Sequence, residues 1–181
     1  MGTAPIFRHL FLQTKIIKIK MTENEIYKLD KYFMNAAIDE AARSYQMGEV
    51  PVGAIVVKNN KIISASSNSV EKDLSSVMHA EIKAIMSAQK ILNSWRLSGC
   101  ALYVTLEPCL MCCGAIILSR IEKVIYAADD PKAGAVNSLY NTLSDKRLNH
   151  TSEISSGIMK EESSALLKKF FQEKRNKKTH S

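Results

Sequence analysis

The sequence predicts a three-layer α/β fold in which a central mixed sheet of five strands carries helices on both faces. Short runs of β-branched and aromatic residues alternate with longer segments of helical periodicity. The first two strand segments are separated only by Asn59-Asn60, which is typical of an antiparallel hairpin. The later strands are each separated by a helix, which is typical of parallel pairing.

The individual elements follow from periodicity and from turn residues. The first helix spans residues 25–47, where apolar side chains recur at near-helical spacing, and Gly48 ends it. The hairpin that follows pairs strands 53–57 and 61–65, and a polar loop covers 67–77. The remaining elements are a helix over 79–92, a strand over 101–105, a helix over 109–118, a strand over 123–127, a loop-rich stretch over 128–150, a short strand at 153–154 and a final helix over 161–174. We expect Trp95, Cys100, Cys113 and Tyr126 in the core.

Length and composition bound the domain organisation. A chain of 181 residues, 46% apolar and 24% charged, fits one globular domain. It has no apolar run of about 18 residues that could span a membrane, and we expect it in the cytoplasm. Residues 1–20 carry basic but no acidic side chains, and Met21 precedes the helix-capping pattern Thr22-Glu23-Asn24-Glu25. We therefore interpret 1–20 as a dispensable basic extension before a single domain over 21–181.

The net charge of +7 is concentrated at the two ends of the chain. The segment 163–181 has six basic residues against the single acid Glu173. A basic helix and tail beside a slightly acidic body suits a polyanionic partner. Charge alone favours a simpler interpretation, a solvated helix with a frayed tail.

Two short segments carry the chemistry: His79-Ala80-Glu81 and Pro108-Cys109-Leu110-Met111-Cys112. Together they offer one imidazole, two thiols and a carboxylate. Three protein ligands, His79, Cys109 and Cys112, leave one corner of a zinc tetrahedron open, as in a catalytic site. Glu81 is then a general acid/base for a water activated by the zinc ion.

The spacing of these residues predicts how they meet. Cys109 and Cys112 share a helix face at i, i+3, and Pro108 suits the start of that helix. His79 and Glu81, at i, i+2, converge only if their helix begins at about His79. We therefore predict two helix N-termini that meet at one zinc ion.

Each segment alone has a simpler interpretation. The first fits a partly buried histidine with a capping glutamate, and the second fits a redox or core cysteine pair. A closed structural site that adds Cys113 is a further alternative. Because Cys112 and Cys113 are adjacent, both thiols would struggle to reach one ion from the same helix.

The H-x-E…P-C-x-x-C pattern is the signature of zinc-dependent nucleobase deaminases. From about residue 25 to residue 175 the chain resembles the bacterial tRNA-specific adenosine deaminase family, which has the cytidine deaminase-like fold. The resemblance is carried by residues 49–54, 79–82, 103–112, 132–135 and the double Phe170-Phe171 on the basic last helix. The zinc motif alone is typical of the whole superfamily, whereas the other stretches are typical of the tRNA branch.

The resemblance implies hydrolytic conversion of adenosine to inosine at the wobble position (A34) of a tRNA anticodon, by a homodimer with one zinc per subunit. It implies His79, Cys109 and Cys112 as zinc ligands and Glu81 as the proton shuttle. The residues that it implies for substrate and RNA contacts are Asn68, Ala80, Asp130, Lys132, Phe170, Phe171 and Arg175. A flipped base in a pocket, and a loop that stacks on aromatic rings beside cations, fit these residue types.

The sequence departs from the family pattern at Cys113, where a small residue is usual, and at Asp129, a second acid beside Asp130. Two other functions remain open at this point. A deaminase of a free base or nucleoside, such as guanine or cytosine, needs no basic helix. A zinc-stabilised RNA-binding module without catalysis would not need Glu81.

Overall fold

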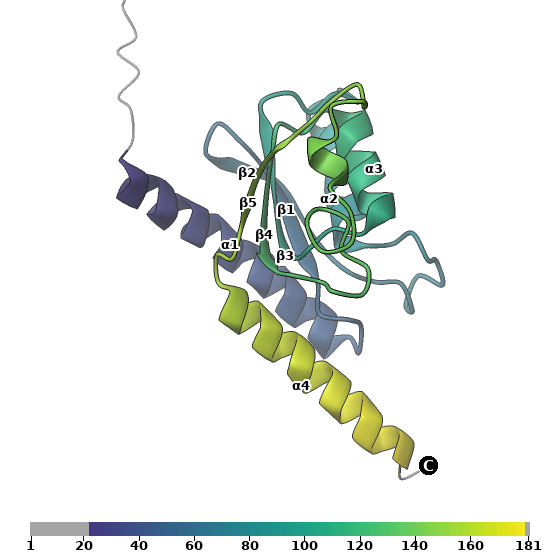
Figure 1. The fold of residues 1–181 in the computed structure, drawn as a ribbon. Helices are drawn as coiled ribbons and strands as arrows, with labels where there is room; N and C mark the ends of the chain where they lie inside the picture. Colours follow the sequence, from purple (N-terminus) through teal and green to yellow (C-terminus); the bar gives the residue numbers. More distant parts are fainter. Residues whose placement is uncertain (1–21, 180–181) are drawn as a thin grey trace, which may run out of the picture.

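Helices and strands follow one another along residues 22–179, which are the residues that the computed structural model describes, in the order that the sequence predicts (Figure 1). Residues 1–20, predicted to be a dispensable extension, lie outside the described residues. The elements are α1 (Glu23–Gln46), β1 (Gly53–Lys58), β2 (Lys61–Ser67), α2 (Ala80–Ile91), β3 (Cys100–Leu106), α3 (Leu110–Ser119), β4 (Lys123–Ala128), the 3₁₀ turn η1 (Thr142–Ser144), β5 (Glu153–Ser156) and α4 (Lys160–Thr179).

The five strands form one mixed sheet in the order β2-β1-β3-β4-β5. Strand β1 pairs antiparallel with both β2 and β3, whereas β3 with β4 and β4 with β5 are parallel. Asn59 and Asn60 have φ values of 50° and 57°, the backbone that a tight hairpin turn requires. The predicted fold class is therefore confirmed.

Helices α1 and α4 cover one face of the sheet, and α2 and α3 cover the other (Figure 1). The larger apolar core lies between the sheet and the α2/α3 layer, and a smaller one lies beneath α1. Gly53 allows α1 to approach β1 closely, because a Cβ at this position would overlap the Ala37 carbonyl oxygen. The α2/α3 layer carries both predicted metal-binding segments.

The ends of α1 follow the local sequence. The Thr22 hydroxyl accepts from the N–H of Glu25, and the Glu25 carboxylate accepts from the N–H of Thr22, so that both groups form the predicted capping box. At the other end, Gly48 takes a φ of 77°, which glycine adopts without strain, and the helix stops there.

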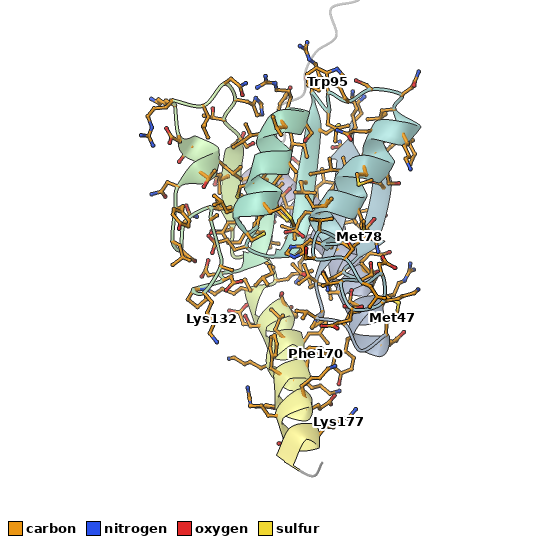
Figure 2. The ribbon with its side chains drawn as sticks, turned by 90° about the vertical axis from the view of Figure 1, so that its right-hand side faces the viewer. Met47, Met78, Trp95, Lys132, Phe170 and Lys177 are labelled. Atoms are coloured by element: carbon orange, nitrogen blue, oxygen red, sulfur yellow. The ribbon has the colours of Figure 1, made fainter. Side chains whose placement is uncertain are left out.

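The prediction that Trp95 belongs to the core is wrong. Its side chain is 57% exposed and carries the Arg96 guanidinium over its ring at 4.6 Å, at the end of the molecule opposite α4 (Figure 2). Trp95 lies in the turn between α2 and β3, where no periodic pattern points it inward. Tyr126, Cys100 and Cys113 are buried as predicted. Among the described residues, none of the helices has the length and apolar character needed to cross a membrane.

Candidate metal centre and active site

Two helix N-termini meet on the α2/α3 side of the sheet, as the spacing of the motif predicts. His79 is the N-cap of α2 and Cys109 is the N-cap of α3, both with extended backbone. Cys112 follows in the first turn of α3 and is fully buried. Cys109 also pairs with Gly134 in an isolated β-bridge, which fixes the start of α3 against the loop that follows β4.

The three ligand atoms have the spacing of a tetrahedral metal site. His79 Nδ1 lies 3.7 Å from Cys109 Sγ and 3.5 Å from Cys112 Sγ. Bond lengths of about 2.0–2.1 Å to nitrogen and 2.3 Å to sulfur place tetrahedral N and S ligands about 3.6 Å apart. His79, Cys109 and Cys112 therefore form a group that can hold a metal ion.

Cys113 does not join this group. Its thiol donates to the Pro108 carbonyl oxygen at 3.7 Å and lies in the apolar core. Burial raises the pKa of Cys113 to about 12, so this thiol stays protonated near neutral pH. The metal-binding group of the described residues thus contains three ligands and not the four of a closed structural site.

The electrostatics of Cys109 suit a metal ligand. The neighbouring Cys112 thiol and, after it, the His79 ring lower the pKa of Cys109 to about 4. The positive end of the α3 dipole favours the same thiolate. Cys109 therefore presents the charged form that binds metal ions.

Glu81 lies in the first turn of α2, beside the metal-binding group. It is 4% exposed, and burial raises the pKa of its carboxyl above the usual range. With His79 and Cys109 it lines a cavity of about 310 Å³. A buried carboxyl at the wall of a cavity, beside a metal-binding group, is suited to proton transfer.

Asn68 and Asp130 line the same cavity, as do Val50, Val70 and Leu106. Asn68 is 6% exposed, and its Nδ2 donates to Glu49 Oε2 at 3.4 Å. The main-chain carbonyl oxygen of Asn68 accepts from the Ser44 hydroxyl at 2.9 Å, so the side-chain oxygen Oδ1 is the acceptor that Asn68 can offer to a ligand in the cavity. Ala80, predicted to contact the substrate, has a fully buried side chain in the core, so that only its main chain is available for such a contact.

Glu49 is a supporting residue to which sequence reasoning gave no role. Its buried carboxylate also accepts from the N–H groups of Glu71 and Lys72, at 3.2 and 2.6 Å. It therefore holds the loop after Asn68 against the start of β1. The signal in the sequence was an acidic residue directly before a buried apolar stretch.

Glu107 is a second supporting residue that the sequence reasoning did not assign. Its carboxylate accepts from the Ser138 hydroxyl and from four backbone N–H groups, those of Asp130, Val136, Asn137 and Ser138. Burial by itself raises its pKa, but the bonds from Asn137 and Ser138 outweigh burial and hold the pKa of Glu107 at about 2. Glu107 thus shapes the loop over 130–138, and its position between a strand and the Pro108-Cys109 segment was the available signal.

A second hollow of about 590 Å³ adjoins the cavity, and Val50, Leu106 and Asp130 line both. We call it the α4 groove. Its other walls are the loop after β4, with Lys132, and one face of α4 (Figure 2). The α4 residues that line it are Leu167, Lys168, Phe171, Gln172 and Arg175.

The two adjacent phenylalanines have different surroundings. Phe171 is 44% exposed in the α4 groove, whereas Phe170 is 6% exposed and packs against Tyr45. Asp129, which departs from the family pattern, pairs with Lys160 at 2.5 Å. The extra acid is thus matched by a cation at the start of α4.

Comparison with known proteins agrees with this geometry. Residues 28–175 match the family model of MafB19-like deaminases. The chain is 47% identical to the tRNA-specific adenosine deaminase of Bacillus subtilis (strain 168) over 87% of its length and 94% of the relative's. It is 50% identical to the enzyme of that name from Aquifex aeolicus (strain VF5), over 81% of its length and 96% of the relative's.

A solved structure from a study of A-to-I editing by tRNA:A34 deaminases at the wobble position is also similar. It superposes with a TM-score of 0.73 at 40% identity, covering 75% of this chain and 99% of that one. Sequence and fold agree over most of the chain. The chain therefore belongs to the family of tRNA-specific adenosine deaminases.

Proposed function

We propose that this protein is a zinc-dependent hydrolase that converts adenosine to inosine at the wobble position of a tRNA anticodon. The observation that carries the proposal is the juxtaposition of His79, Cys109 and Cys112, spaced for a zinc tetrahedron, with the buried Glu81 in a cavity that shares lining residues with the α4 groove. The relatives named for this activity support the substrate.

The donor set fits zinc. One imidazole and two thiols are soft-to-borderline ligands, and three of them leave a position open. A zinc ion held there would lower the pKa of water from about 16 toward about 7 and so supply a nucleophile at neutral pH.

Glu81 provides the proton path. Its carboxylate takes one proton from the attacking water and delivers it to a ring nitrogen of the adenine. It then takes the second proton, from the new hydroxyl at C6, and delivers it to the departing amine. The C6–N bond breaks, ammonia leaves and a carbonyl oxygen remains on the ring. Asn68, held by Glu49, offers its side-chain oxygen Oδ1 to the base in the cavity.

The α4 groove supplies the surface for RNA. Lys132, Lys168 and Arg175 bring cations to it, and Phe171 brings an aromatic ring. Cations bind phosphates, and aromatic rings stack on the splayed bases of RNA loops. Phe170 and Asp130 stay predictions as RNA contacts: one packs against Tyr45, and the other accepts from the N–H groups of Lys132 and Ala133.

We further propose that the protein acts as a homodimer in the cytoplasm. Support for a dimer comes from exposed apolar side chains on α3 and on the loop after Gly134, which lies beside the start of that helix. They are Leu110, Met111, Leu118, Leu139 and Tyr140. Sedimentation of the native chain and of Leu118→Glu tests this interface. We expect the native chain to sediment as a dimer and the variant as a monomer, because a charge in the apolar surface opposes its burial.

The decisive experiment measures inosine in a tRNA transcript that carries A34, after incubation with the zinc-loaded protein. Glu81→Gln should abolish inosine formation while zinc content and tRNA binding persist. Glu153→Gln, at an exposed carboxylate of the edge strand β5, is the matched control and should retain activity. A transcript with G34 should give no inosine.

Guanine, cytosine and their nucleosides are assayed alongside. Turnover of a free base or nucleoside, with no inosine formed in tRNA, would contradict the proposed tRNA substrate and favour a free-base or nucleoside deaminase. Tight tRNA binding by the native protein and by Glu81→Gln, with no turnover by either, would favour a non-catalytic zinc module.

A further inference from the structure

Tyr45, in the last turn of α1, is the contact point for the distal half of α4. Its hydroxyl donates to both carboxylate oxygens of Glu173, each at 2.7 Å. Its ring meets the Phe170 ring edge-on at 6.2 Å between centroids, and the Lys169 ammonium lies 5.2 Å from its ring centroid. One side chain of α1 thus makes three different kinds of contact with α4.

The residues that face Tyr45 and those that line the α4 groove belong to the same turns of one helix. Lys169, Phe170 and Glu173 contact Tyr45, whereas Lys168, Phe171, Gln172 and Arg175 line the groove. Each set follows the i, i+3, i+4 spacing of a single helix face. Because a helix turn is rigid, the contact on the first face sets the direction of the second.

The helix needs a second anchor because of its length. Near its start, the Ser163 hydroxyl donates to the Thr105 carbonyl oxygen at 2.5 Å and ties α4 to β3. Glu173 lies ten residues later, about 15 Å along the helix axis. Figure 1 shows α4 projecting beyond the sheet, and the side chains of 171–177 are exposed. Tyr45 therefore contacts the C-terminal half of α4, which projects beyond the sheet, and restricts its movement relative to the sheet.

The contact with Tyr45 also keeps the negative charge of Glu173 away from the α4 groove. Glu173 is the only acid in 163–181, and a carboxylate in the groove would repel phosphates. The hydrogen bond to Tyr45 directs it to the opposite side of the helix. The same bond raises the pKa of Tyr45, because it stabilises the protonated phenol that donates to the carboxylate.

We propose that Tyr45 is a positioning residue for tRNA binding, which holds α4 so that Lys168, Phe171 and Arg175 face the mouth of the catalytic cavity. The proposal rests on the function proposed above. Tyr45 lines neither the cavity nor the groove, so that its effect passes through the helix.

The test compares Tyr45→Phe and Tyr45→Ala with the native protein in the A34 tRNA assay. Tyr45→Phe keeps the ring contacts and loses only the hydrogen bond; we expect KM for tRNA to rise about threefold, and about tenfold or more for Tyr45→Ala. The kcat at saturating tRNA and the zinc content should not change, since neither variant touches the metal-binding group. Amide hydrogen exchange over 168–177 should accelerate in the same order.

Tyr27→Phe and Tyr27→Ala are the matched controls. Tyr27 is 54% exposed on α1, five turns before Tyr45, and borders a hollow formed with residues 155–158 instead of α4. A double-mutant cycle adds the pairwise evidence: in a Glu173→Ala background, Tyr45→Phe should raise KM no further.

Three results would overturn the proposal. KM could stay unchanged in Tyr45→Ala even where the thermal midpoint falls, which would make the contact purely stabilising. KM could rise equally in the Tyr27 variants, or kcat could fall with KM unchanged. If the native protein makes no inosine from A34 tRNA, the proposed function fails first, and this proposal falls with it.

Discussion

The carboxylate of Glu107 fills the space that a side chain at Gly134 would need. A Cβ at this glycine would overlap Oε2 and Cδ of Glu107 and would crowd the Asp130 carbonyl oxygen. The same carboxylate holds the loop over 130–138 through backbone N–H groups, and Gly134 forms a bridge with Cys109, a predicted zinc ligand. The metal-binding group and the loop over 130–138 thus both depend on the close contact between Gly134 and Glu107.

Gly134→Ala should lower the free energy of unfolding by about 2–3 kcal/mol, because a buried, hydrogen-bonded carboxylate has to move. Gly114→Ala is the control, since a Cβ there meets nothing within 4 Å and its backbone is helical. That substitution should raise stability by about 0.5–1 kcal/mol. Urea unfolding of both variants checks the pair, and equal effects would contradict the contact with Glu107.

Cys112 and Cys113 are adjacent and equally buried, yet only Cys112 faces His79. Cys112→Ala should lose the zinc and with it all deaminase activity, because two ligands hold the ion poorly. Cys113→Ala should keep about one zinc per chain, as expected for an open three-ligand site. Elemental analysis of the two proteins decides the matter, and zinc loss from Cys113→Ala would instead favour a closed site of four ligands.

Phe170 and Phe171 should separate stability from RNA binding. Phe170→Ala removes a buried ring and should cost about 3 kcal/mol of folding stability. Phe171→Ala removes a half-exposed ring in the α4 groove and should weaken tRNA binding while stability changes little. Thermal unfolding and tRNA-binding titrations on both variants measure the two effects. An unchanged affinity in Phe171→Ala would remove this residue from the RNA surface.

Turnover of tRNA should fall steeply with salt. If Lys132, Lys168 and Arg175 each contact a phosphate, kcat/KM should drop about 20-fold between 50 and 200 mM salt, given a slope of about 0.7 per contact for single strands. Lys168→Gln should lower the slope of log kcat/KM against log salt concentration by about 0.7, the value for one phosphate contact. Lys90→Gln, in the last turn of α2, removes the same charge away from the groove and should leave the slope unchanged. A free-base deaminase would show almost no salt dependence.

Much of the molecule was predictable from local sequence. Within the described residues, hydrophobic periodicity and turn residues place the α-helices and strands closely, because each of these elements buries a face of fixed period. The exceptions are the end of α4, which runs to Thr179 instead of 174, and the 3₁₀ turn η1, which lies in a stretch predicted to be loop-rich. The i, i+3 cysteines and the i, i+2 His79 and Glu81 predict two converging helix starts, and His79 and Cys109 are indeed the N-caps. Trp95 was placed wrongly because composition says nothing about which side of a turn a side chain takes.

The tertiary structure alone decided the contacts between residues that are far apart in the chain. Glu49 and Glu107 look like ordinary acids in the sequence, and only the fold brings the backbone N–H groups of distant loops to their carboxylates. Two adjacent phenylalanines carry the same local signal, yet the docking of α4 on Tyr45 buries one and turns the other toward the groove. Local spacing determines which side chains share a helix face, whereas the partner that each face meets depends on packing across the whole chain.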